Sequence, residues 1–95
     1  MAIASGLSET VGNTPLLRLT RVTQGIKLVI GATCEFFSSS GNLKDRILHH
    51  MVESIERDGR LRPGMTIIEG STGNTGISTA MVAAARGFRG HLVAL

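Results

Sequence analysis

The chain has 95 residues, a formal net charge of +3 and 42% hydrophobic residues, with 12 Gly and neither Trp nor Tyr. This length allows one domain at most, and the mixture of small and aliphatic residues is typical of an α/β protein with tight turns between strands and helices. The ten basic residues form no run of five or six, so the sequence does not indicate binding to nucleic acid or to a membrane. With a single cysteine, no disulfide within the chain and no cysteine metal site is expected.

The first part of the chain is predicted to be a surface arm over residues 1–12. It lacks the charged start and apolar stretch of a secretory signal, and no later apolar run approaches the roughly 18 residues that span a bilayer. We therefore expect a soluble cytoplasmic protein. Residues 14–20 then read as a short extended segment, and 26–32 as a strand rich in β-branched residues.

A loop of small polar residues over 38–42 leads into a predicted helix. Asn42 is positioned to cap this helix, Asp45 in the first turn suits the helix dipole, and Asp58-Gly59 is a plausible end. The apolar residues that fall on one face of this helix are Leu43, Ile47, Leu48, Met51, Val52 and Ile55.

The second half of the chain predicts a strand over 65–69, a loop over 70–76, a helix over 77–86 that ends at Gly87, and a strand over 91–95. Strand, helix and strand in this order imply parallel pairing through a right-handed crossover. The apolar side of the second helix is predicted to consist of Ile77, Met81, Ala84 and Ala85. Because a parallel strand needs cover on both faces, a chain that stops here is expected to be a fragment of a larger α/β fold.

The first candidate site is Lys44, which follows a loop of small residues and lies in the first turn of the predicted helix. A cation is disfavoured at a helix N-terminus, and a neutral lysine amine is what Schiff-base chemistry requires. Asp45 beside it works in the opposite direction by favouring the charged amine. From this local pattern alone, an ordinary surface lysine remains the alternative.

The second candidate site is GSTGNTGI, residues 70–77, between a strand and a helix. Glycines at intervals of three allow the backbone to approach a ligand, and the helix N-terminus offers N–H groups to an anion. The spacing matches neither the dinucleotide-binding nor the P-loop pattern, so it indicates only a phosphate or carboxylate site, or a tight turn without a ligand. If the preceding strands are parallel, this loop and Lys44 should open on one edge of the sheet, which suits an enzyme that forms imines with amino acids.

Four segments together resemble the N-terminal third of the fold-type II pyridoxal-phosphate enzymes, and cysteine synthase (O-acetylserine sulfhydrylase) and cystathionine β-synthase in particular. They are VGNTPLLRL (11–19), SGNLKDR (40–46), RPGMTIIEGSTGNTGI (62–77) and AMVAAARGF (80–88). The resemblance covers nearly the whole chain from Val11 onward, with the motifs in the family's order. It implies an α/β fold, here a partial three-layer αβα parallel sheet that is truncated.

The resemblance also implies roles for individual residues. Lys44 matches the lysine that forms the internal aldimine with pyridoxal 5′-phosphate and acts as the base at the substrate α-carbon. Asn74 matches the asparagine that hydrogen-bonds the 3′ oxygen of the cofactor. The substrate α-carboxylate would be bound by the loop made of Ser71, Thr72, Gly73, Asn74 and Thr75.

The reaction implied is β-replacement, in which O-acetylserine and sulfide give cysteine and acetate. The partner would be a small amino-acid substrate, without nucleic acid or membrane, and the parent enzyme a homodimer. The resemblance places the glycine-rich phosphate loop and the residue facing the pyridine nitrogen beyond residue 95, so residues 1–95 are expected to form the N-terminal portion of the enzyme and to be inactive alone. A cystathionine β-synthase-like or other fold-type II lyase, and a small anion-binding module without catalysis, stay open as alternatives.

Departures from the family pattern lie in both loops. Ser38-Ser39 stand in place of the usual Asn-Pro, Asn42 replaces a typical Ser, and Gly70-Ser71-Thr72 replace Pro-Thr-Ser. The replacements are small or polar, which is compatible with the same chemistry.

Overall fold

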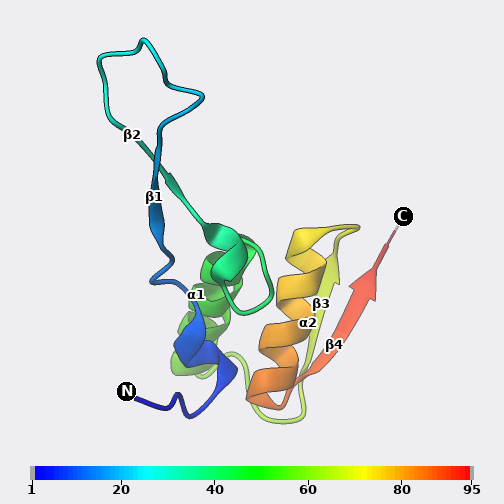
Figure 1. Ribbon diagram of the computed structural model, residues 1–95. Coiled ribbons are helices and arrows are strands. Elements are labelled where there is room, and N and C mark those ends of the chain that lie inside the picture. The colour runs from blue at the N-terminus through cyan, green and yellow to red at the C-terminus, as the bar shows by residue number, and fades with distance from the viewer. Residues whose placement is uncertain (1, 95) are drawn as a thin grey trace.

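The computed structural model describes residues 2–94, which form two short helices of the 3-10 type, two α-helices and four strands. Figure 1 shows a helical and sheet-containing body from which one long hairpin projects. The residues predicted as an arm are mostly exposed, and they include the 3-10 helix η1 (Leu7–Thr10), which contacts α2 (Asn74–Arg86).

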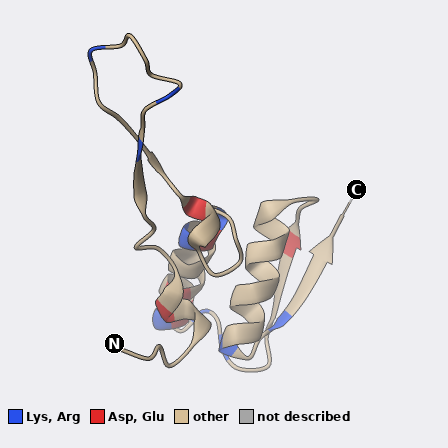
Figure 2. Ribbon diagram, viewed as in Figure 1, with Lys and Arg blue, Asp and Glu red and all other residues tan. Residues whose placement is uncertain are grey.

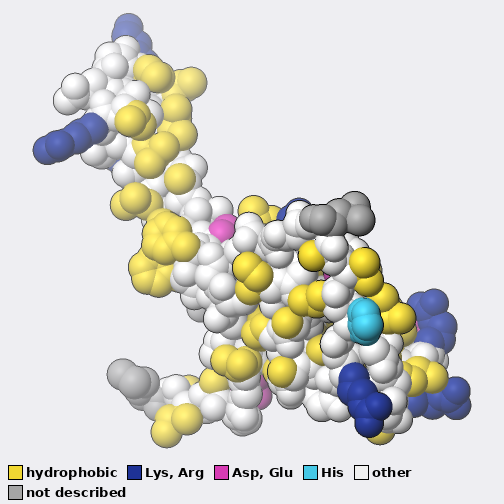
Figure 3. Space-filling view, turned by 90° about the vertical axis from the view of Figure 1, so that its right-hand side faces the viewer, with side chains coloured by type: hydrophobic (Ala, Val, Ile, Leu, Met, Phe, Trp, Pro, Cys, Tyr) yellow, Lys and Arg dark blue, Asp and Glu magenta, His cyan; other side chains and the backbone are white. Residues whose placement is uncertain are grey.

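The projecting hairpin consists of β1 (Leu16–Leu19) and β2 (Ile30–Thr33), which pair antiparallel. The first predicted extended segment is thereby confirmed, whereas the strand predicted over 26–32 begins only at Ile30. Residues 26–29 are exposed and belong to the long connection at the tip, so their β-branched composition finds no partner strand. Figure 3 shows how hydrophobic side chains line this hairpin.

The first α-helix, α1 (Lys44–Arg57), ends where it was predicted, because Gly59 with φ 76° turns the chain away. Its inward face is narrower than the hydrophobic period suggests: Leu48 and Val52 are buried, while Leu43, Ile47 and Met51 are about half exposed. The residue that takes their place at the start of the inward face is Asp45, which is completely buried.

The predicted strand–helix–strand unit is confirmed by β3 (Thr66–Gly70), α2 and β4 (Arg89–Val93), with β3 and β4 parallel. The last strand begins two residues earlier than predicted and includes Gly90 and His91, while Leu95 lies outside the described residues. α2 packs against both strands and α1 packs against α2 (Figure 1). None of the helices in residues 2–94 is long and apolar enough to cross a membrane.

The second helix differs from its prediction in its start and in its buried face. It begins at Asn74 rather than 77, and Ile77 is 53% exposed. Its buried residues are Gly76, Ser78, Thr79, Val82 and Ala83. The helix is covered on two sides, by the strands and by α1, and small side chains on those sides allow close approach, which hydrophobic periodicity does not register.

The core lies between the two α-helices and the sheet. It consists of Leu48, Val52, Val82, Ala83 and Phe88. At the far end of the helix pair, the Arg86 guanidinium donates to the Glu56 carboxylate at 2.6 Å, so the C-terminal turns of α1 and α2 lie together. The two helices therefore run side by side in the same direction, and their N-termini lie at one end of the molecule (Figure 1).

Two glycines in and before β4 should respond in opposite ways to alanine. A Cβ on Gly90 would lie 3.6 Å from that of Ala83, an ordinary contact, so Gly90→Ala should raise the free energy of unfolding by about 0.5 kcal/mol through the unfolded chain. Gly87 has φ 77°, so Gly87→Ala should lower it by about 1 kcal/mol. Urea titration of both variants checks this, and a loss of stability for Gly90→Ala would contradict the packing of α2 on β4.

Candidate functional site

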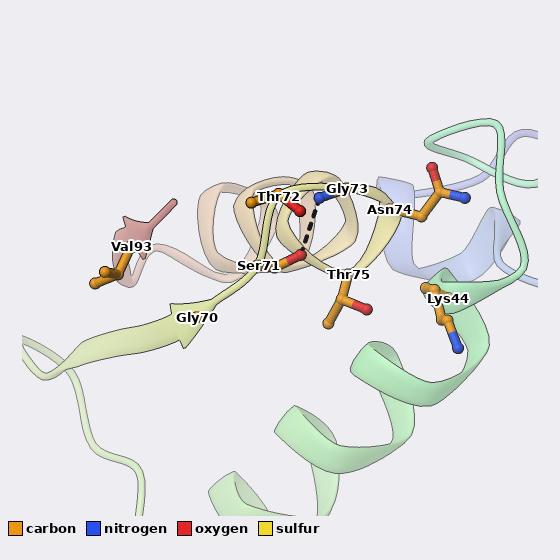
Figure 4. A pocket seen from close by; sticks show the side chains of 8 residues that line it. All are labelled: Lys44, Gly70, Ser71, Thr72, Gly73, Asn74, Thr75 and Val93. Carbon is orange, nitrogen blue, oxygen red and sulfur yellow. Dashed lines mark hydrogen bonds between the residues drawn. The ribbon is translucent and has the colours of Figure 1, made fainter. Parts of the chain in front are cut away.

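A pocket of about 540 Å³ lies where the two helix N-termini meet the end of the sheet. Its lining residues are Lys44, Gly70, Ser71, Thr72, Gly73, Asn74, Thr75 and Val93. Figure 4 shows Lys44 at the start of α1, beside Asn74 and Thr75 at the start of α2. The structure thus brings the predicted lysine and all five predicted loop residues together in one pocket.

Lys44 owes its position to the loop before α1. The side-chain oxygen of Asn42 accepts the Lys44 N–H at 2.8 Å, although the capping position itself falls on Leu43 and not on Asn42 as predicted. Among residues 2–94 no carboxylate lies within 4.0 Å of the Lys44 amine, and the Asp45 side chain bonds to Ser40 and Ser78 instead. Asp45 therefore makes no ion pair with Lys44, contrary to the competition expected from their adjacency.

The turn of residues 70–75, hereafter the 70–75 turn, is held by the sheet and by its own serine. Gly70 pairs with Val93, and the Ser71 N–H donates to the Val93 carbonyl at 3.0 Å. The Ser71 hydroxyl oxygen accepts the N–H groups of Gly73 at 3.2 Å and Gly76 at 2.9 Å, so it closes the first turn of α2 (Figure 4). Gly76 is buried against Ser71, where an added Cβ would lie 3.4 Å from the serine Cβ.

Backbone donors of the 70–75 turn remain available to a ligand. The first N–H groups of a helix have no partner within it, and here Gly76 donates to Ser71 and Ile77 to the Gly73 carbonyl. Within the described chain, the N–H groups of Asn74 and Thr75 have no such acceptor. Because two parallel helices direct their N-termini to this end, the pocket favours an anion such as a carboxylate.

The two candidate sites are brought together by helix packing and not by the shared sheet edge that was predicted. β1 and β2 form a sheet of their own, so Lys44 and the 70–75 turn do not share a sheet edge. They meet because α1 packs along α2, with Asp45 and Ser78 in contact near the two helix starts. On its other side, α1 is tied by Arg46 to the short 3-10 helix Glu35–Phe37 that follows β2, where the guanidinium donates to Glu35 at 2.9 Å. Figure 2 shows acidic and basic residues close together where the hairpin meets the body. This ion pair lowers the pKa of the Glu35 carboxyl, chiefly through the hydrogen bond from Arg46.

Val93 lines the pocket and was not predicted. It lies beside Gly70, the first residue of the predicted 70–77 loop, because the parallel register brings the ends of β3 and β4 together. The contact of Ser78 with Asp45 joins residues 33 positions apart, and nothing in either helical pattern indicated it.

The burial of Asp45 affects its ionisation. Burial alone raises the pKa of this carboxyl, but hydrogen bonds from the Ser40 hydroxyl, the Ser78 hydroxyl and the Ser40 N–H outweigh it, so the pKa lies below its usual value of 3.8. The carboxylate is thus ionised at neutral pH although it is inaccessible to water.

Comparison with known proteins decides the family. Residues 7–94 match the family described as pyridoxal-phosphate dependent enzyme. The chain belongs to this family. It is 49% identical over 89 residues to cystathionine beta-synthase from Rattus norvegicus, and 42% identical over 93 residues to "Probable cysteine synthase" from Bacillus subtilis. A crystal structure of cysteine synthase from Entamoeba histolytica superposes with a TM-score of 0.89 at 37% identity and covers 96% of this chain.

These matches confirm the fold-type II α/β architecture and dependence on pyridoxal phosphate. The chain spans 16% of the rat protein, 30% of the Bacillus protein and 28% of the Entamoeba structure. It therefore corresponds to a short part of each of them.

The lowered pKa of Asp45 predicts a pH-dependent contribution to stability. Because the folded pKa lies below the unfolded one, this contribution is complete above the usual carboxyl pKa and is lost as the pH falls through the folded value. The difference in unfolding free energy between the wild type and Asp45→Asn should therefore narrow as the pH is lowered from about 6 to about 3. Urea titrations across this range check it, and a difference independent of pH would contradict the assigned ionisation.

Proposed function

We propose that this chain supplies the cofactor-binding lysine and the substrate-carboxylate site of a β-replacement enzyme acting on an O-activated serine. The reaction is the conversion of O-acetylserine and sulfide to cysteine and acetate. The observation that carries the proposal is that Lys44 and the residues of the 70–75 turn line one pocket. Family membership supports the cofactor, and relatives named cysteine synthase support the reaction.

The pocket fits pyridoxal phosphate by its donor set. It combines a primary amine with hydroxyls on Ser71, Thr72 and Thr75 and the carboxamide of Asn74, and its volume of about 540 Å³ lies within the ordinary range for small-molecule sites. Lys44 would bind the cofactor through its amine, and Asn74 would hydrogen-bond the 3′ oxygen of the cofactor. When bound, pyridoxal phosphate acts as an electron sink for charge that develops at the α-carbon of an amino acid.

The protein residues would divide the remaining work. Lys44 Nζ would take the substrate α-proton, because it is the amine of the pocket and lies at the start of α1 beside the 70–75 turn. The 70–75 turn binds the substrate α-carboxylate through the N–H groups of Asn74 and Thr75 and the neighbouring hydroxyls. A carboxylate fixed there orients the α-carbon toward Lys44.

The cofactor lysine can be tested with the protein at its full natural length. Incubation with pyridoxal phosphate, reduction with borohydride and peptide mapping should label Lys44, because this residue lines the pocket. Lys44→Ala should abolish the label on this segment and the activity. Lys27→Ala is the matched control, because Lys27 is an exposed residue of the hairpin tip and its removal should change neither.

Two results would contradict the assignment. A label on another lysine in the wild type would remove Lys44 from its proposed role. If no lysine is labelled and Lys44→Ala still binds phosphate ligands, the 70–75 turn belongs to an anion-binding module without catalysis.

A second reaction is favoured by one observation, the 49% identity to cystathionine beta-synthase. Both reactions use the same lysine and carboxylate site, so the pocket does not separate them.

The purified protein is offered O-acetylserine with sulfide, and separately serine with homocysteine, the two halves of cystathionine. A kcat/KM for cysteine formation at least about tenfold above that for cystathionine formation, a difference near 1.4 kcal/mol in transition-state binding, would assign the cysteine-forming reaction. The reverse order would assign the cystathionine-forming reaction.

A further inference from the structure

We infer that Asp45 is a positioning residue, whose buried carboxylate joins the loop before α1 to the first turns of α2 and so fixes Lys44 opposite the 70–75 turn. This inference rests on the proposed function of Lys44. It concerns a residue that does not line the pocket and that would not touch cofactor or substrate.

The carboxylate has three protein donors. One oxygen accepts the Ser40 N–H at 2.7 Å. The other accepts the Ser40 hydroxyl and, at 2.6 Å, the Ser78 hydroxyl of α2. Asp45 is 0% exposed, so these donors replace water completely, and bonds to an ionised acceptor are the stronger kind of hydrogen bond.

Asn42 extends this network to Lys44 itself. Its amide donates to the Ser40 oxygen at 2.8 Å, while its carbonyl oxygen accepts the Lys44 N–H at 2.8 Å and lies 3.0 Å from the Ser78 hydroxyl. Lys44 is therefore flanked in the sequence by two residues that contact Ser78 of α2, Asn42 before it and Asp45 after it. Ser78 lies one turn after Asn74, so the link reaches α2 next to the pocket.

The network is arranged around a carboxylate. All three partners donate to it, so an asparagine at position 45 would place an NH2 group where one oxygen now accepts. Either the Ser40 N–H would then lose its acceptor or both serine hydroxyls would have to rotate and accept. A buried donor without an acceptor is costly, so the loop before α1 would shift to satisfy it. Since this loop ends at Lys44, the shift would change the distance between the amine and the 70–75 turn.

A second carboxylate between the same two helices serves as the control for a purely stabilising role. The Arg86 guanidinium donates to the Glu56 carboxylate at 2.6 Å, but in the last turns of the helices, far from the pocket. Glu56→Gln removes that ion pair and leaves the helix starts intact. Asp45→Asn and Glu56→Gln therefore weaken the same helix pair at opposite ends.

The experiment uses the full-length protein and two readouts. The first is hydrogen exchange of the Lys44 and Gly76 amides, which needs no cofactor. The second is the rate at which Lys44 captures pyridoxal phosphate, followed by borohydride reduction over a range of cofactor concentrations. Ser78→Ala, which removes one donor only, is measured beside Asp45→Asn in case the latter does not fold, and the double variant completes a cycle.

We expect Asp45→Asn and Ser78→Ala to speed exchange at both helix starts and to slow capture at saturating cofactor by roughly tenfold, as small misplacements of a reacting group do. The double variant should lose little more than either single one. Glu56→Gln should lower the melting temperature and change neither readout.

The inference is overturned if Glu56→Gln slows capture as much as Asp45→Asn does, or if exchange rises at one helix start only. If the wild type captures no pyridoxal phosphate at Lys44, the proposed function fails. The exchange readout then still decides whether Asp45 couples the two helix starts.

Discussion

The site depends on one contact, the seating of α1 against α2 through a buried carboxylate. Lys44 and the 70–75 turn belong to different supersecondary units, and no shared sheet holds them in register. Leu48, Val52 and Val82 supply the apolar part of the contact, and Asp45 with Ser78 forms its polar end. A carboxylate in such a place is tolerated because every oxygen is satisfied, and it makes the contact specific in a way that apolar packing alone is not.

Parallel helices explain the electrostatic character of the pocket. The Arg86–Glu56 pair and the Asp45–Ser78 bond align α1 and α2 with their N-termini together, so the positive ends of both helix dipoles lie at one end. That end attracts anions. An amino acid substrate needs this property at its carboxylate.

Local chemistry in the sequence predicted much of this fold and site. The glycine turns, the βαβ unit and the 70–77 loop as a candidate anion site follow from patterns within a few positions, whereas the roles of Lys44 and Asn74 follow from the resemblance of four ordered segments to a known family. What was missed depends on partners far along the chain. Most of the strand predicted over 26–32 has no partner strand, because pairing with β1 begins only at Ile30. The second helix buries Ser78 and Thr79 because it is enclosed on two sides. Hydrophobic periodicity describes one apolar face, and it cannot show a buried polar contact between helices.

The double acceptance by the Ser71 hydroxyl has a consequence for affinity. Because the serine oxygen holds the N–H groups of Gly73 and Gly76, the 70–75 turn has its shape before any ligand arrives. A loop that is already ordered loses little conformational entropy when it closes on a carboxylate. Selectivity among amino acids would then come from the groups around the side chain, while recognition of the shared carboxylate would be nearly the same for each of them.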